Sequence, residues 1–170
     1  MAHLELDLVT ESETPCALSE EELVRTVSFV LDEEGVTRPC GVSLSVVDDE
    51  RMRELNADWR GIDRATDVLS LECERPDDPD LADGEPCELG DIVLAPAYIA
   101  HQAQGFGTTP ANETRLLLVH GVLHLLGYDH MEEDEATVME AREDELVARL
   151  VGGGSLAGVR ITRHREDEDA

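Results

Sequence analysis

The segment of residues 116–126 constrains the fold of this chain more than any other. It reads LLLVHGVLHLL, so apolar side chains would occur on nearly every face of the helix that it favours. A helix that is apolar all round has no face to turn to solvent and belongs in the middle of a fold. Thr109 and Pro110 provide a cap and a first helical position, and Gly127 provides a natural end. The sequence therefore predicts a central helix that other elements cover.

Hydrophobic periodicity and capping residues predict these other elements. Alternating or apolar runs indicate strands at residues 3–9, 42–47, 67–73 and 92–94. Ser19 can cap a helix, with Glu22 reaching back to the backbone of Ser19, and Gly35 ends that helix. Further helices are expected just after Asp48 or Asp49, over residues 97–104 and over residues 132–150.

Length and composition limit the class of protein. At 170 residues the chain suits a single domain, which we place at residues 1–152. Residues 153–170 turn polar after a run of glycines, and they are predicted to be a disordered tail. The chain has no apolar run of about 18 residues that would span a membrane, and its N-terminus lacks the pattern of a signal peptide. A cytoplasmic protein without a membrane partner is therefore expected.

The net charge is the unusual feature of the composition. Forty acidic residues against 13 basic ones, all of them arginines, give a formal net charge of -27. Such a field repels nucleic acids and anionic membranes at long range, and by itself it argues against an RNA partner. It also suits a protein adapted to a salty cytoplasm. The choice of partner must therefore depend on where the arginines lie.

One acidic segment stands apart from the predicted elements. Residues 74–86 contain six acidic residues and three prolines. This composition predicts an exposed loop, which could be a lid or a passive solvated connection.

Three of the six histidines lie within eleven residues, at His120, His124 and His130. Residues four apart on a helix share a face, so His120 and His124 can present their rings to one point. Gly127 breaks the helix, and the chain can then fold back to bring His130 to that point. Three neutral imidazoles suit one Zn²⁺ ion and leave its fourth position for a water, whose pKa falls towards about 7. The sequence therefore predicts a catalytic zinc site.

The spacing of these histidines equals that of the metzincin proteases, HExxHxxGxxH. In metzincins the residue after the first histidine is a glutamate that acts as general base in peptide hydrolysis. Gly121 occupies that position here and has no side chain. The metal ligands are thus kept while the protease base is missing, so a metalloprotease is the weaker interpretation.

Three further segments complete a wider pattern: LNADWRG at residues 55–61, ATDVLSL at residues 65–71 and LGDIV at residues 89–93. Together with HGVLHLLGYDH, and in the same order along the chain, they resemble the YbeY family of bacterial rRNA maturation factors. The resemblance implies a single α+β domain, with a small four-stranded mixed sheet, surrounding helices and a zincin-like three-histidine metal site.

The same resemblance implies a function. It implies a zinc-dependent, single-strand-specific endoribonuclease that matures the 3′ end of 16S rRNA and takes part in ribosome quality control. It assigns one zinc ion to His120, His124 and His130, and it assigns a role in activity to Arg60. The implied partners are the 16S rRNA precursor, proteins of the small ribosomal subunit and an assembly GTPase. A non-enzymatic assembly factor with a structural zinc is the remaining alternative.

Four arginines lie within residues 51–64: Arg51, Arg53, Arg60 and Arg64. A local basic groove can bind phosphate at short range, where salt screens the distant acidic charge. Arg60 is predicted to clamp the scissile phosphate and to offset charge in the transition state. Arg51 and Arg53 have acidic neighbours and are interpreted as part of an exposed helix face.

Several other side chains have two interpretations each. The proton acceptor could be Asp67, Asp91 or Asp129, but the first two could equally be turn residues and the third could orient a histidine. A 2′-hydroxyl of RNA could also be the nucleophile. Trp59 could stack on a base or anchor the core. Ser70 could contact substrate or be an ordinary strand residue.

Overall fold

The computed structural model describes residues 4–128 and 132–150 of the chain. Within these residues, four strands form one sheet and five helices surround it. The elements are β1 (Leu4–Glu11), α1 (Glu20–Glu33), β2 (Cys40–Val47), α2 (Asp49–Arg60), β3 (Val68–Glu72), β4 (Cys87–Leu94), α3 (Pro96–Phe106), α4 (Pro110–Leu125) and α5 (Glu133–Leu150). The predicted α+β domain with a four-stranded mixed sheet is confirmed.

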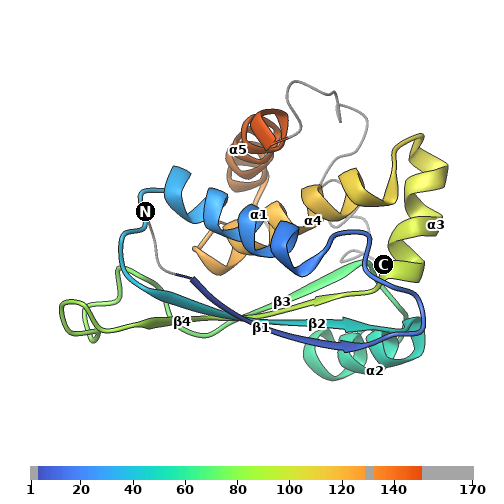
Figure 1. Cartoon of the computed structure of the whole chain (residues 1–170), viewed down its shortest axis with the longest axis horizontal. Helices are drawn as coiled ribbons and strands as arrows, with labels where there is room; N and C mark the ends of the chain where they lie inside the picture. The colour runs from blue at the N-terminus through green and yellow to red at the C-terminus, as the bar shows by residue number, and fades with distance from the viewer. Residues whose placement is uncertain (1–3, 129–131, 151–170) are drawn as a thin grey trace.

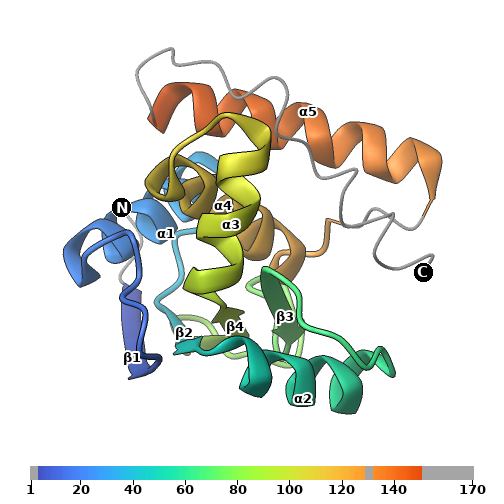
Figure 2. The ribbon, with the colours of Figure 1, turned by 90° about the vertical axis from the view of Figure 1, so that its right-hand side faces the viewer.

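The strand order of the sheet is β1-β2-β4-β3. β1 and β2 pair in parallel, as do β2 and β4, whereas β3 runs antiparallel to β4 at one edge. Four helices, α1, α3, α4 and α5, cover one face of the sheet, and α2 lies on the other face (Figure 1). The turned view shows the same layers, with α2 beneath β3 and β4 (Figure 2).

α4 is the predicted central helix. It contacts α1, α3 and α5 as well as β3 and β4. Its residues from Leu116 to Leu123 are all buried, and so is Leu125. The apolar segment thus has neighbours on every side, because a helix without a polar face is stable only when other elements enclose it.

The predicted caps begin their helices as expected. The Glu22 backbone N–H donates to Ser19 Oγ at 3.2 Å, and the Ser19 backbone N–H donates to Glu22 Oε1 at 3.4 Å. The Asn112 backbone N–H donates to Thr109 Oγ1 at 3.1 Å. Asp48 occupies the N-cap position of α2, but its carboxylate accepts instead from Ser12 and from the backbone of Glu13.

The fourth strand is longer than predicted. β4 begins at Cys87 and passes through Gly90, ahead of the predicted start of the strand at residue 92. Gly90 has a φ of +140°, and a Cβ atom there would overlap the backbone carbonyl oxygen of Leu71 on β3. The strand therefore requires glycine at position 90, because no side chain fits between β3 and β4 there.

Some predictions are outside the described part of the chain or concern its surface. The tail at residues 153–170 and the domain boundary at residue 152 lie outside the described residues. Residues 74–86 contain neither helix nor strand, as predicted. Among the described helices, none is both long enough and apolar enough to cross a membrane.

Candidate metal centre and active site

Two of the three predicted metal ligands lie on one face of α4. The rings of His120 and His124 are 6.0 Å apart between centroids and are tilted by only 15° from parallel. His120 is buried, and His124 is half-buried. The four-residue spacing thus places the two rings side by side, as expected for residues one helical turn apart.

Each of these rings has an oxygen acceptor at Nδ1. His120 Nδ1 lies 3.3 Å from Glu143 Oε2 on α5, and His124 Nδ1 lies 2.9 Å from the backbone carbonyl oxygen of Tyr128. A metal-ligating histidine typically donates its second ring N–H to a carboxylate or a backbone carbonyl. Nδ1 faces that acceptor in both rings, so Nε2 is the atom suited to a metal. The two described histidines therefore fit a zinc site.

Sequence reasoning missed Glu143. Glu143 is buried in α5, between Met139 and Leu146 on the apolar face of that helix. A carboxylate in a buried position is expensive unless it is paired, and its partner here is His120. An acidic residue within an apolar helical stripe is the signal that could have revealed it.

Tyr128 links the end of α4 to α1 and α5. Its hydroxyl donates to Glu34 Oε1 at 2.7 Å, and Arg142 Nε on α5 donates to Glu34 Oε2 at 2.6 Å. Burial raises the pKa of the Tyr128 hydroxyl, and the hydrogen bond to Glu34 raises it further. The carbonyl that orients His124 thus belongs to a residue that is itself held by two other helices.

The third predicted ligand, His130, lies outside the described residues, as does Asp129. Among residues 4–128 and 132–150, no group of three histidine, cysteine, aspartate or glutamate side chains is arranged to hold a metal ion. The three-histidine site therefore stays a prediction. The structure gives the relative positions of two of its members, His120 and His124.

Gly121 lies where α4 packs closely on the sheet. A Cβ atom at this position would be 3.1 Å from Ser70 Oγ on β3 and 3.3 Å from Ile92 Cδ1 on β4. A glutamate, as in the metzincins, would therefore have to displace both neighbours. Ser70 therefore lies on the side of β3 that faces α4.

Arg60 is the last residue of α2, on the face of the sheet opposite α4. It is half-buried, and its Nη2 atom is enclosed. Gly61 follows in the left-handed conformation, with a φ of +72°, and turns the chain towards β3. Arg60 thus ends a helix on one face of the sheet, whereas His120 and His124 belong to α4 on the other face (Figure 2).

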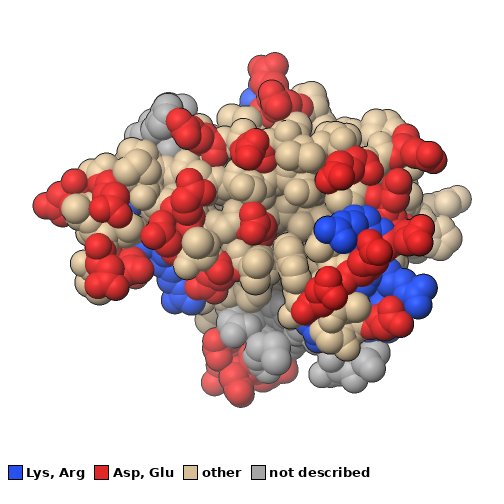
Figure 3. Space-filling view, turned by 90° about the horizontal axis from the view of Figure 1, so that it is seen from below, with Lys and Arg blue, Asp and Glu red and all other residues tan. Residues whose placement is uncertain are grey.

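The arginines on the exposed side of α2 are paired with acids, as interpreted from the sequence. Arg51 contacts Glu54 at 3.3 Å, and Arg53 donates two hydrogen bonds to Asp63 at 2.8 and 3.2 Å. The bonds from Arg53 lower the pKa of the Asp63 carboxyl. Seen from below, basic side chains on this face lie among acidic ones (Figure 3). This surface is charge-compensated and forms no broad basic groove.

Asp67, Asp91 and Trp59 each had two interpretations from the sequence, and the structure shows the position of each. The buried carboxylate of Asp67 accepts from the Val68 backbone N–H at 2.7 Å and from Gln102 Nε2 at 2.8 Å, which ties the start of β3 to α3. Asp91 precedes Ile92 on β4, and since strand side chains alternate, it faces away from α4. Trp59 packs beneath the sheet against a small apolar cluster, as a core anchor would.

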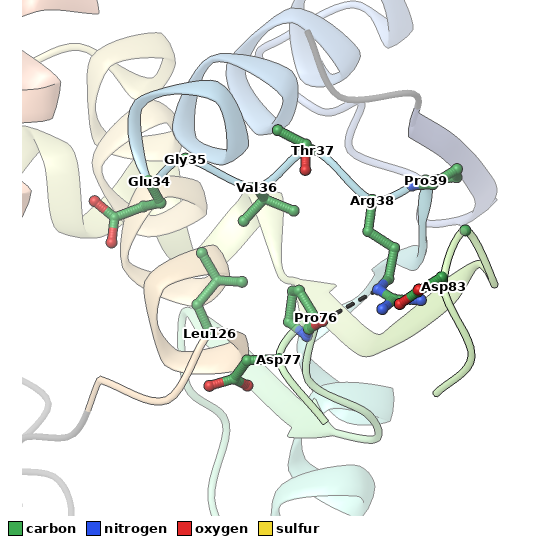
Figure 4. Close-up of a pocket in the computed structure, with 11 residues that line it drawn as sticks. Glu34, Gly35, Val36, Thr37, Arg38, Pro39, Pro76, Asp77, Asp83 and Leu126 are labelled. Carbon is green, nitrogen blue, oxygen red and sulfur yellow. Dashed lines mark hydrogen bonds between the residues drawn. The ribbon is translucent and has the colours of Figure 1, made fainter. Parts of the chain in front are cut away.

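A cavity of about 540 Å³ lies beside the end of α4. Its wall combines the turn after α1, the acidic loop and Leu126 (Figure 4). The carboxylates of Glu34, Asp77 and Asp83 line it, so it does not suit a phosphate.

Comparison with known proteins identifies relatives over most of the chain. The sequence model of the family described as endoribonuclease YbeY matches residues 9–151. Endoribonuclease YbeY of Clostridium perfringens is 43% identical, over 76% of this chain and 86% of its own length. That of Desulfitobacterium hafniense is 48% identical over 64% of this chain and 71% of its own. That of a Mycobacterium species is 38% identical over 86% and 84% of the two chains.

A solved structure agrees in fold. The solution structure of TM1509 from Thermotoga maritima superposes with a TM-score of 0.58 and covers 98% of this chain and 97% of its own, at 24% sequence identity. The family match spans both the central helix and the strand segments that carried the resemblance. On these grounds the chain belongs to the endoribonuclease YbeY family.

Proposed function

We propose that this protein is a zinc-dependent endoribonuclease that cleaves single-stranded RNA at the site formed by α4, β3 and the end of α2. Its relatives are named endoribonucleases, which gives the reaction class. The observation that carries the metal assignment is the pair of Nδ1 contacts to Glu143 and to the Tyr128 carbonyl. Such contacts are what ligating histidines need on their non-ligating side.

In this proposal one zinc ion is held by His120, His124 and His130. When bound, zinc supplies a Lewis acid for a phosphoryl oxygen and for a water nucleophile. Glu143 and the Tyr128 carbonyl keep the two described rings in one tautomer and one orientation. Arg60 binds the scissile phosphate and offsets the charge that develops on it.

Two routes for the nucleophile follow from the proposal, and the products distinguish them. Attack by water leaves a linear phosphate or a hydroxyl at the new 3′ end, whereas attack by the neighbouring 2′-hydroxyl leaves a 2′,3′-cyclic phosphate. Asp67 does not suit the role of proton acceptor, because its carboxylate is already bound to the Val68 backbone and to Gln102. End-group analysis of the cleaved RNA decides between the routes.

The proposed cellular role is maturation of the 3′ end of 16S rRNA in the cytoplasm, together with ribosome quality control. Proteins of the small ribosomal subunit and an assembly GTPase are the proposed partners. Family membership supports this role. The acidic surface is consistent with it if contacts to RNA are confined to a few arginines near the site.

The first test compares two histidine variants. We expect one zinc per chain in the wild-type protein, and His124→Ala should stay folded while losing both zinc and cleavage of single-stranded RNA. His101→Ala is the matched control, because His101 is an exposed histidine on α3. Zinc analysis, circular dichroism and a gel assay provide the measurements. Processing of 16S rRNA by a zinc-free His124→Ala variant in cells would instead favour the assembly-factor alternative, and cleavage of casein would favour a protease.

The role of Arg60 is tested in the same assays. Arg60→Ala should keep its zinc and slow cleavage by about 100-fold, the usual effect of removing one donor to a transition-state charge. Arg51→Ala lies on the same helix, paired with Glu54, and should leave the rate unchanged. Equal rates for the two variants would remove Arg60 from the mechanism.

A further inference from the structure

The acidic loop brings an arginine to the turn that follows α4. Gly127 lies between His124 and His130 in the sequence and has a φ of +107°. A Cβ atom at Gly127 would be 3.0 Å from Arg75 Nη1 and 3.1 Å from Arg75 Cζ. The Arg75 guanidinium therefore packs on the bare backbone of this turn, next to the end of the helix that carries His124.

The backbone that follows Arg75 is anchored by another arginine. Arg38 Nε donates to the Pro76 carbonyl oxygen at 3.1 Å, and Arg38 Nη1 donates to those of Ala82 and Glu85 at 2.7 and 2.6 Å. Figure 4 shows Arg38 bound to Pro76, the residue directly after Arg75. Because these bonds join both halves of the loop to residue 38, the loop is a fixed support for Arg75.

The guanidinium of Arg75 has hydrogen-bonding capacity that residues 4–128 and 132–150 do not use. Its Nε donates to Glu72, which fixes the direction of the side chain. Neither Nη group donates to an acceptor in the part of the chain that the structure describes, and the side chain is 49% exposed. An arginine presents its donors in a flat fork that matches the oxygens of a phosphate. A half-exposed fork beside the candidate metal centre is thus suited to a phosphate ligand.

We propose that Arg75 binds a backbone phosphate of single-stranded RNA adjacent to the cleaved one. This inference rests on the proposed function, and it adds a second phosphate contact to that of Arg60. Arg60 comes from the α2 face of the sheet, whereas Arg75 comes from the loop beside the end of α4. The acidic loop thereby contributes an RNA-binding residue, Arg75, although six of its thirteen residues are acidic.

A matched pair of variants tests the proposal. Arg75→Ala and Arg25→Ala change the net charge equally, and each removes an exposed arginine that is paired with one glutamate. The probe is a short fluorescent 2′-O-methyl RNA, and its dissociation constant is measured by anisotropy at several salt concentrations. We expect Arg75→Ala to bind about fivefold more weakly, and its salt slope to fall by about 0.7, the value for one phosphate contact on a single strand. The dissociation constant of Arg75→Lys should lie between those of the wild type and Arg75→Ala.

The controls separate this proposal from the proposed function. Arg25→Ala should change neither the affinity nor the slope beyond the small effect of net charge. Equal affinities and slopes for Arg75→Ala and Arg25→Ala would overturn the role of Arg75, while cleavage of RNA by the wild-type protein would still stand. Absence of cleavage by the zinc-loaded wild type would refute the proposed function, and the binding data would still decide whether Arg75 holds a phosphate.

Discussion

His120 and His124 lie one turn apart on α4, yet the groups that orient their rings come from different distances along the chain. His124 uses the carbonyl of Tyr128, four residues further on. His120 uses Glu143, which is 23 residues away on α5. The first contact forms when the helix ends at Gly127, whereas the second requires α5 to dock on α4. One half of the described site is therefore encoded locally, and the other half depends on tertiary packing.

This difference has an energetic consequence. The Tyr128 carbonyl cannot be removed by a side-chain substitution, so the orientation of His124 is protected from most mutations. The Glu143 carboxylate can be removed, and its loss would leave the buried His120 ring without that acceptor. A buried polar group that loses its partner costs about 1–3 kcal/mol. The site should therefore be more sensitive on the α5 side.

Among changes to the groups that orient the two rings, the largest effect is expected for Glu143→Ala. Loss of the carboxylate next to a ligating histidine typically lowers metal affinity about 10–100-fold. We expect a decrease of this size in the zinc affinity, measured by competition with a chromogenic chelator, and a smaller decrease for Glu143→Gln. Glu135→Ala, at an exposed position in the first turn of α5, is the control. An unchanged affinity in Glu143→Ala would mean that α5 does not support the metal site.

A smaller effect is expected for Tyr128→Phe. This change removes the hydroxyl that donates to Glu34 but keeps the carbonyl that accepts from His124. The free energy of unfolding should fall by about 1 kcal/mol, the usual value of one hydrogen bond, and the zinc affinity should fall by no more than about threefold. Chemical denaturation and the same chelator assay measure the two quantities. A loss of zinc affinity as large as that of Glu143→Ala would contradict the proposed difference between the local orientation of His124 and the long-range orientation of His120.

The smallest effect on the site is expected for Ser19→Ala, at a cap that is purely local. The variant should lose about 1 kcal/mol of stability and none of its zinc affinity.

The backbone and hydroxyl of Ser19 lower the pKa of the Glu22 carboxyl. A lowered pKa stabilises the fold above the unfolded value of about 4.3, and this contribution is lost as the pH falls through the folded pKa. The difference in unfolding free energy between the wild type and Ser19→Ala should therefore shrink between pH 7 and pH 3. A constant difference would contradict the capping box.

Local spacing determined much of this protein from the sequence alone. The apolar segment fixed α4 as the central helix, and the four-residue interval placed His120 and His124 on one face of it. Ser19 and Thr109 began their helices as predicted. These features depend on residues within one or two turns of each other, so a linear pattern is sufficient to reveal them.

Contacts between distant segments were decided only by the tertiary structure. The pairing of Glu143 with His120, the packing of Arg75 on Gly127 and the support of the loop by Arg38 join residues from 23 to 52 positions apart. The charge of the chain gave no indication of them, because a net charge of -27 describes the sum and not the place of each group. Spacing along the chain specifies which residues share a face, but only the packing of helices and loops specifies what that face meets.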